Sequence, residues 1–176
     1  MMMQLHFLLN TRELGIERHN VGAVVYCSEN IPFKEIVSQI PEVSECLNGF
    51  HTPIPKMFYS IYRVKEWDGK VADSEQYIEL EDETINQDYA DFFGVEVLNG
   101  SMLDEKDGKD MVVINEAAMK AFGWTQPVGK KMGKLGKQCI VKGVIKNISY
   151  NAPIHPVAPA MFHLPDSRDR GGIIFK

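Results

Sequence analysis

The sequence has 176 residues and a formal net charge of −5; 44% of its residues are hydrophobic and 24% are charged. A chain of this length and composition can bury one compact core or two small ones, which excludes disorder along its whole length. Its lysines are spread along the chain rather than gathered in one basic segment, so the sequence does not predict nucleic-acid binding.

The first fifty residues predict a helix followed by a β-α unit. Leucines at helical spacing in residues 3–16 indicate a short helix, and the β-branched run 20–27 indicates a strand. A second helix is expected to begin near Pro32, because proline suits a first helical turn. Its apolar residues continue at helical spacing past Pro41, where a kink or break is expected, and Asn48–Gly49 is expected to end it.

The middle of the chain predicts strands joined by short turns. Residues 56–64 alternate large side chains, as a strand does, and Asp68–Gly69 is typical of a tight hairpin turn. Residues 77–86 indicate another strand of mixed polarity. Residues 87–95 then predict a short helix, and residues 95–100 predict a short or edge strand.

Residues 111–124 carry the clearest local signals in the sequence. Val112 to Ile114 indicate a strand, and Asn115 is a good N-cap for a helix over 116–122. Gly123 supplies the left-handed residue that commonly ends a helix. This stretch therefore predicts a strand that leads directly into a capped helix.

The remaining segments add strands. Residues 129–148 indicate a loop or hairpin and then a long strand, in which Gly143 is expected to leave no room for a side chain. The proline-rich stretch 151–164 must run mostly extended, and residues 171–176 begin a last strand. The chain as a whole is therefore expected to be α+β, with more strand than helix.

The histidines and serines give no catalytic pattern. His155 and His163 flank the proline-rich stretch and could share a site with Asp166, although a surface or loop role is the simpler interpretation. No histidine pair has the spacing of a zinc motif, and no serine lies in a G-x-S-x-G elbow. The odd number of cysteines, Cys27, Cys46 and Cys139, argues against a complete disulfide framework.

Two other stretches invite a functional interpretation and do not support one. The loop after Gly123 lacks the spacing of a phosphate-binding loop, and Lys131 stands where a serine or threonine would have to reach Mg²⁺. An acidic run has neither the glycine nor the order of a calcium loop; it comprises Glu79, Glu81, Asp82, Glu83, Asp88 and Asp91. The sequence thus indicates no catalytic, cofactor-binding or metal-binding residue, and we expect no enzyme activity.

The order of motifs from Tyr89 to Phe162 resembles the MacB-type periplasmic core domain of FtsX-like ABC-transporter permeases. The motifs are "YADFFGVEVLNG", "VVINEAA", "GWTQPVGKK", "CIVKGVIKN" and the proline-rich exit "APIHPVAPAMF". Residues 7–25 are similar to the segment that follows the first transmembrane helix in such permeases from Bacteroides-like bacteria. The motifs build turns, caps and strands, so the resemblance carries over no catalytic site.

The resemblance implies an α+β fold in two lobes. A β-α-β porter-like lobe is expected from residues 1–63, with a membrane-proximal helix, and from a return strand in residues 165–176. An inserted, mainly-β lobe is expected in residues 64–164. The flanking membrane helices, and a last β-α-β portion of the domain, are expected to lie outside this sequence.

The resemblance also implies a function in transport across the inner membrane, with this domain on the periplasmic side. ATP-driven movement of the transmembrane helices would be relayed to a periplasmic substrate or partner protein, a process called mechanotransmission. The implied partners are a cognate ABC ATPase subunit, reached through the missing transmembrane helices, and a second permease subunit, identical or different. No cofactor is implied.

Two other functions remain open from the sequence. A periplasmic ligand-binding or sensor module would show a deep pocket lined by aromatic side chains such as Tyr59, Tyr62 and Trp67. A carboxylate-dependent hydrolase would show two close, buried carboxylates drawn from the acidic run.

The permease interpretation makes a specific prediction about the two ends of the chain. A domain looped out between two membrane helices must return to the membrane that it left. The strands in residues 21–27 and 172–175 should therefore share one sheet. One face of that sheet is expected to be bare, because no helix follows the last strand.

Overall fold

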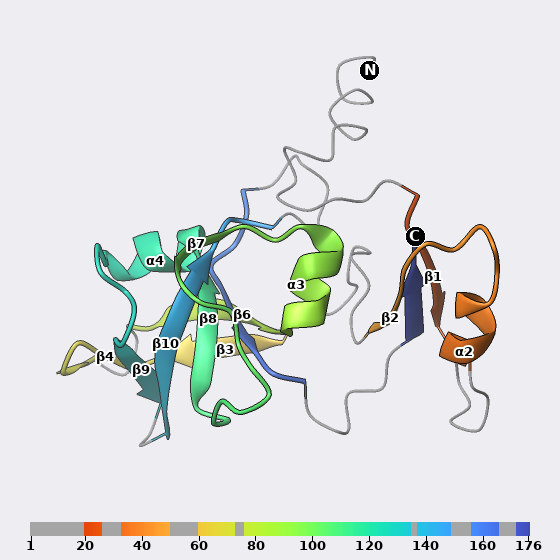
Figure 1. Ribbon diagram of the computed structural model, residues 1–176. Helices are drawn as coiled ribbons and strands as arrows, with labels where there is room; N and C mark the ends of the chain where they lie inside the picture. The colour runs from red at the N-terminus through yellow and green to blue at the C-terminus, as the bar shows by residue number, and fades with distance from the viewer. Residues whose placement is uncertain are drawn as a thin grey trace, which may run out of the picture.

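The computed structural model describes residues 20–25, 33–49, 60–72, 76–134, 137–148, 156–165 and 172–176. Within these ranges the chain is mostly strand, with three short helices (Figure 1). The predicted α+β class is therefore confirmed. The helix predicted in residues 3–16 and the first part of the strand predicted in residues 56–64 lie outside the described residues.

The larger sheet contains nine strands, and two pairs of neighbouring strands are parallel: β10 with β8, and β11 with β6. In spatial order its strands are β3 (Ile61–Val64), β6 (Ile78–Thr84), β11 (Ala160–His163), β8 (Met111–Asn115), β10 (Lys137–Ile145), β9 (Lys131–Lys134), β4 (Glu66–Trp67) and β5 (Lys70–Val71), with β7 (Val97–Gly100) beside β10. β4 and β5 form the tight hairpin that Asp68–Gly69 predicts, and both turn residues have positive φ.

This sheet closes on itself. β3 and β4 are two parts of one extended segment, and only Lys65 lies between them. One edge of the segment pairs with β6, and the other pairs with β9 through Trp67 and the bond from Lys65 N to the Gly133 carbonyl (2.9 Å). The strand path therefore returns to its start and encloses a barrel, which removes most free sheet edges.

Alternation along the strands divides the buried side chains into two sets. Val112 and Ile114 of β8 join the cluster inside the barrel, whereas Val113, between them, packs in the cluster outside it. Met161 and Phe162 of β11 divide in the same way. Because both faces of these strands are buried, their sequence is continuously apolar rather than alternating.

Helix α4 (Glu116–Phe122) begins and ends where the sequence predicts, and it covers the barrel. The Asn115 side chain accepts a hydrogen bond from Ala118 N at 2.9 Å, and Gly123 ends the helix with φ 68°. Ala118 and Phe122 pack into the inner cluster. Phe122 also stacks on Trp124, with 4.1 Å between the ring centroids.

Gly143 lies in β10, opposite Gly100 of the antiparallel strand β7. A Cβ atom at this position would lie 2.3 Å from the Ser101 carbonyl oxygen and 3.1 Å from that of Asn99, and both are backbone atoms. The register against β8 also shifts between Val141 and Gly143, which marks a β-bulge. The expectation that this strand position has no room for a side chain is confirmed.

The smaller sheet joins the two ends of the chain. It consists of β1 (Gly22–Val25), β12 (Gly172–Phe175) and β2 (Cys46–Gly49), in that spatial order. β1 and β12 are antiparallel, with Gly22 opposite Phe175. The prediction that these distant strands share a sheet is confirmed, whereas the lobe limits at residues 63/64 and 164/165 stay predictions; β3, which crosses the first limit, belongs to the larger sheet.

Two expectations for this region are wrong. Helix α2 spans only Phe33–Ser38, and Asn48–Gly49 lies in β2 instead of ending a helix. Helical spacing is overridden here because residues 44–49 pair with the last strand and Lys176. The sheet is also not bare: Ile173 and Ile174 point to opposite faces, and they are 1% and 0% exposed.

Candidate functional site

Helix α3 (Gln87–Phe93) lies between the small sheet and the barrel (Figure 1). Asn86 caps its amino end by accepting from Tyr89 N, and Gly94, with φ 63°, ends it. Its aromatic side chains form one buried cluster with residues from both sheets. The cluster includes Tyr89, Phe92 and Phe93 of the helix, Leu47 and Ile174 of the small sheet, and Val113, Ile145 and Phe162 of the barrel strands.

A cleft of about 480 Å³ opens at the amino end of α3. Four separate parts of the chain line it: residues 86–88, residues 101–105, Lys142 of β10, and Leu164 after β11. Three of the lining residues are acidic, namely Asp88, Asp104 and Glu105. The cleft is thus polar and acidic at its rim, with apolar side chains such as Leu103 beneath.

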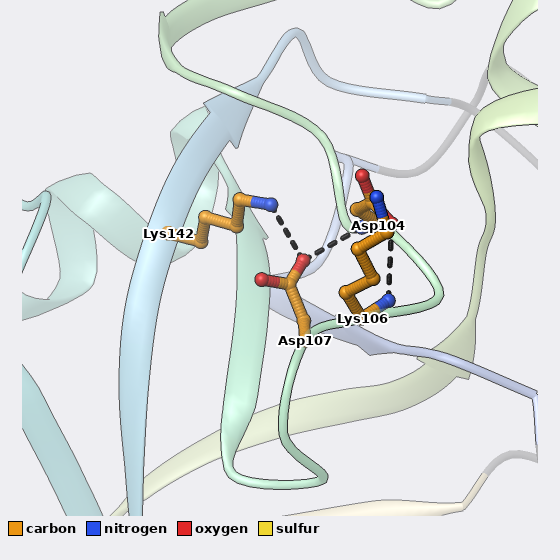
Figure 2. Close-up of polar contacts among 4 residues, drawn as sticks. All are labelled: Asp104, Lys106, Asp107 and Lys142. Atoms are coloured by element: carbon orange, nitrogen blue, oxygen red, sulfur yellow. Dashed lines mark hydrogen bonds and ion pairs between the residues drawn. The ribbon is translucent and has the colours of Figure 1, made fainter.

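The loop beside this cleft is fixed by Asp107 (Figure 2). Its Oδ2 accepts from Lys142 Nζ at 2.5 Å and from Asp104 N at 2.6 Å, while Asp104 Oδ1 accepts from Lys106 N at 3.0 Å. The backbone donor at Asp104 and the Lys142 ammonium lower the pKa of Asp107. The positive charge of Lys142 is therefore balanced by Asp107, and the other charged residues that line the cleft are acidic.

The residues that resembled a phosphate-binding loop hold a surface turn instead. Lys130 Nζ donates to Asp68 Oδ1 at 2.6 Å, and Trp124 Nε1 donates to Asp68 Oδ2 at 2.5 Å. The Lys130 bond, followed by the Trp124 bond, lowers the pKa of Asp68. These contacts fix the β4–β5 turn against the barrel.

The acidic run is divided between two elements: its first four carboxylates lie in β6, and Asp88 and Asp91 lie in α3. Asp82 and Glu83 are consecutive in β6, so their side chains point to opposite faces and do not pair with each other. Glu79 lies outside, 2.9 Å from Arg63 Nε, with both side chains about half exposed. The described residues contain no group of three or more metal-ligating side chains.

His163 is the one member of its predicted trio that the structure describes; His155 and Asp166 lie outside the described ranges. Its Nε2 lies 3.2 Å from Asp82 Oδ1, and its Nδ1 lies 2.9 Å from the Leu164 carbonyl oxygen. Sequence reasoning missed the contact with Asp82, because it depends on β6 and β11 being neighbours.

The predicted aromatic pocket is not formed by the residues that can be placed. Tyr62 and Trp67 pack against the cluster inside the barrel, and burial raises the pKa of Tyr62. Trp67 also borders a smaller cleft of about 360 Å³ beside the β4–β5 turn. Tyr59 lies outside the described residues.

Known proteins similar to this chain are found among solved structures, not among protein-family models or curated proteins. No protein-family model matches the sequence, and no curated protein matches it significantly. No helix in the described ranges is long and apolar enough to cross a bilayer.

Three solved structures are similar to this chain. A domain attributed to a permease protein from Porphyromonas gingivalis is 17% identical with a TM-score of 0.52; the match covers 81% of this chain and 64% of that one. The periplasmic region of MacB from Actinobacillus actinomycetemcomitans is 18% identical with a TM-score of 0.52, and the match covers 97% and 79%.

The third is the extracellular domain of the noncanonic ABC-type transporter YknZ from Gram-positive bacteria, which is 16% identical with a TM-score of 0.51. That match covers 89% of this chain and 83% of the YknZ domain. This chain thus spans about two thirds to four fifths of the length of the three structures. The resemblance seen in the sequence is confirmed at the level of the fold: the chain has the fold of a MacB-like periplasmic domain.

Proposed function

We propose that this chain is the periplasmic domain of an ABC-transporter permease subunit, and that it relays ATP-driven movement of transmembrane helices to a periplasmic substrate or partner. The observation that carries the proposal is the fold, which the chain shares with extracytoplasmic domains of such transporters. On this proposal the domain performs no catalysis, and ATP is hydrolysed by a separate subunit in the cytoplasm. A second permease subunit would complete the transporter in the inner membrane.

The arrangement of the chain ends supports the same function. Gly22, at the start of β1, lies opposite Phe175, at the end of β12, so the start of β1 and the end of β12 lie at the same end of these two neighbouring strands. A domain held by two membrane helices needs this arrangement, because both connections must reach the same surface. Helix α3 then joins the small sheet to the barrel through one buried cluster.

Location and partner can be tested in the full-length protein that contains this chain. Val71 is 76% exposed, and Val64, in the same part of the barrel, is 0% exposed. In a background without native cysteines, a membrane-impermeant maleimide should label Val71→Cys in intact spheroplasts. The matched variant Val64→Cys should react only after unfolding. Labelling of Val71→Cys only after cell lysis would contradict a periplasmic location.

The partner is tested by purification. The full-length protein in mild detergent should retain an ABC ATPase subunit, and the complex should hydrolyse ATP. A permease that purifies without any ATPase under several detergents would contradict the transporter proposal.

A second candidate function is a periplasmic ligand-binding module. The cleft of about 480 Å³ at the amino end of α3 favours it, because its volume is within the range of small-molecule sites. Screening small cationic metabolites by thermal shift, with Asp104→Asn as the matched variant, would test it. A stabilising ligand whose effect disappears in Asp104→Asn would support this alternative.

A further inference from the structure

The return strand reaches helix α3 through a single charged side chain. Lys176 follows β12 directly, and its ammonium donates to the Phe92 carbonyl oxygen in the last turn of α3. The ammonium also lies 4.5 Å from the centroid of the Phe92 ring and 3.4 Å from the Glu45 carboxylate. Only 21% of the Lys176 side chain is exposed, so this is a packed contact rather than a surface ion pair.

The contact completes the helix at its carboxyl end. The last carbonyl groups of a helix lack partners within the helix, and a positive charge near them is favourable. The last turn of α3 contains no basic residue of its own, and the Gly94 N–H donates to the carbonyls of Ala90 and Asp91. Lys176, from another part of the chain, donates to the Phe92 carbonyl and places a positive charge at this end of the helix.

Lys176 is fixed at its backbone as well as at its side chain. Its N–H donates to the Glu45 carbonyl at 3.0 Å, and its carbonyl accepts from Ser44 N at 2.7 Å. One residue thus belongs to the small sheet by its backbone and to α3 by its side chain. At the other end of α3, residues 86–88 line the acidic cleft.

We propose that Lys176 is a positioning residue that couples the return strand to α3, so that displacement of the strand moves the helix and changes the cleft at its amino end. The inference rests on the proposed transport function and names the path by which movement enters the domain. Apolar contacts such as those of Leu47 and Ile174 with α3 have no preferred direction, whereas a hydrogen bond does. The Lys176 bond therefore restrains the position and the rotation of α3 more specifically than the apolar contacts do.

The mechanical contact can be tested on the 176-residue chain alone. With native cysteines replaced, nitroxides at Gln39→Cys, beside α2, and Val71→Cys, on the barrel, report the distance between the two sheets. We expect Lys176→Met to broaden this distance distribution at least twofold and Lys176→Arg to keep it narrow. The control is Lys146→Met, because Lys146 pairs with Glu96 in an exposed ion pair, and it should leave the width unchanged.

Simple destabilisation is separated from loss of coupling by thermal melting of the same samples. If Lys176→Met does not fold, Lys176→Gln takes its place: it removes the positive charge and shortens the side chain, and it should also broaden the distribution. A distribution in Lys176→Met as narrow as in the unsubstituted chain would overturn the inference, whatever is found about transport.

Transmission to the cleft needs the assembled transporter. Ser101 is exposed and lines the cleft. The maleimide labelling rate of Ser101→Cys therefore reports how accessible the cleft is. ATP should change this rate severalfold with Lys176 or Lys176→Arg and leave it unchanged with Lys176→Met. An equal ATP effect in Lys176→Met would overturn the inference, whereas a permease that retains no ATPase would overturn the proposed function and leave the result on the isolated chain standing.

Discussion

Asn115 provides the sharpest test of the packing described above. The side chain is 1% exposed and makes three hydrogen bonds. Its oxygen accepts from Ala118 N at 2.9 Å and from Ala160 N at 3.0 Å, and its amide nitrogen donates to the Ala158 carbonyl at 2.8 Å. The residue therefore caps α4 and also attaches β11, with the segment before it, to the end of β8.

Replacing Asn115 by alanine should therefore cost more than a helix cap. Loss of an N-cap alone costs about 1 kcal/mol, which is what the sequence predicts. The other two bonds add about 1 kcal/mol each, and more if the buried Ala160 N–H and Ala158 carbonyl remain unpaired. We expect Asn115→Ala to lower the free energy of unfolding by roughly 3 to 4 kcal/mol.

The matched control is Asn86→Ala at the start of α3. Asn86 also caps a helix of seven residues, and its side chain accepts from Tyr89 N at 2.9 Å. Its loss should cost about 1 kcal/mol. Urea unfolding followed by tryptophan fluorescence measures the free energy of unfolding of both variants, with the same dependence on urea concentration used for each. Equal costs for Asn115→Ala and Asn86→Ala would refute the role of Asn115 in attaching β11.

Three further predictions follow from other parts of the structure. Gly143→Val should lower the free energy of unfolding by about 2 kcal/mol or more, because a side chain would meet the backbone of residues 99–101. The control Gln138→Val, at an exposed position of the same strand, should be nearly neutral. The urea midpoints of the two variants measure this difference. Because the pKa of Asp107 is lowered, its contribution to stability is present above the unfolded-state pKa, near pH 4, and is lost as the pH falls through the folded-state value. The difference in free energy of unfolding between the unsubstituted chain and Asp107→Asn should therefore shrink on acidification. A difference that grows would contradict this assignment. Calorimetric titration with Mg-ATP should show no heat beyond dilution, because the loop after Gly123 lacks the residues of a phosphate-binding loop. A micromolar dissociation constant would show that the chain does bind the nucleotide.

The sequence predicts this fold best where adjacent residues decide the structure. The β8–α4 unit is an example, since Asn115, the helix and Gly123 are all local signals. The β4–β5 turn is another, because Asp68 and Gly69 suit positive φ whatever surrounds them. Gly143 was recognisable because a glycine in a β-branched strand needs a steric reason.

Prediction fails where partners are distant in the sequence. Nothing local shows that Lys65 meets Gly133 and closes the barrel, or that His163 lies beside Asp82. The same limit explains the error at Asn48–Gly49, whose helical context is overridden by pairing with the last strand. The contact between Lys176 and α3 belongs to this class too, because it joins residues 84 positions apart.

The two sheets differ in stiffness in a way that bears on how movement could pass through the domain. The barrel is closed and filled, with Ile114 and Met132 at 0% and 1% exposure, so it should move as one body. The small sheet has three strands of four residues each, which is close to the minimum for independent stability. It therefore depends on the helices packed against it. If the domain relays movement as proposed, force applied at the chain ends would first load the contacts between the small sheet and α3, which include the Lys176 contact. Substitutions there should alter the transfer of movement while the barrel itself stays folded.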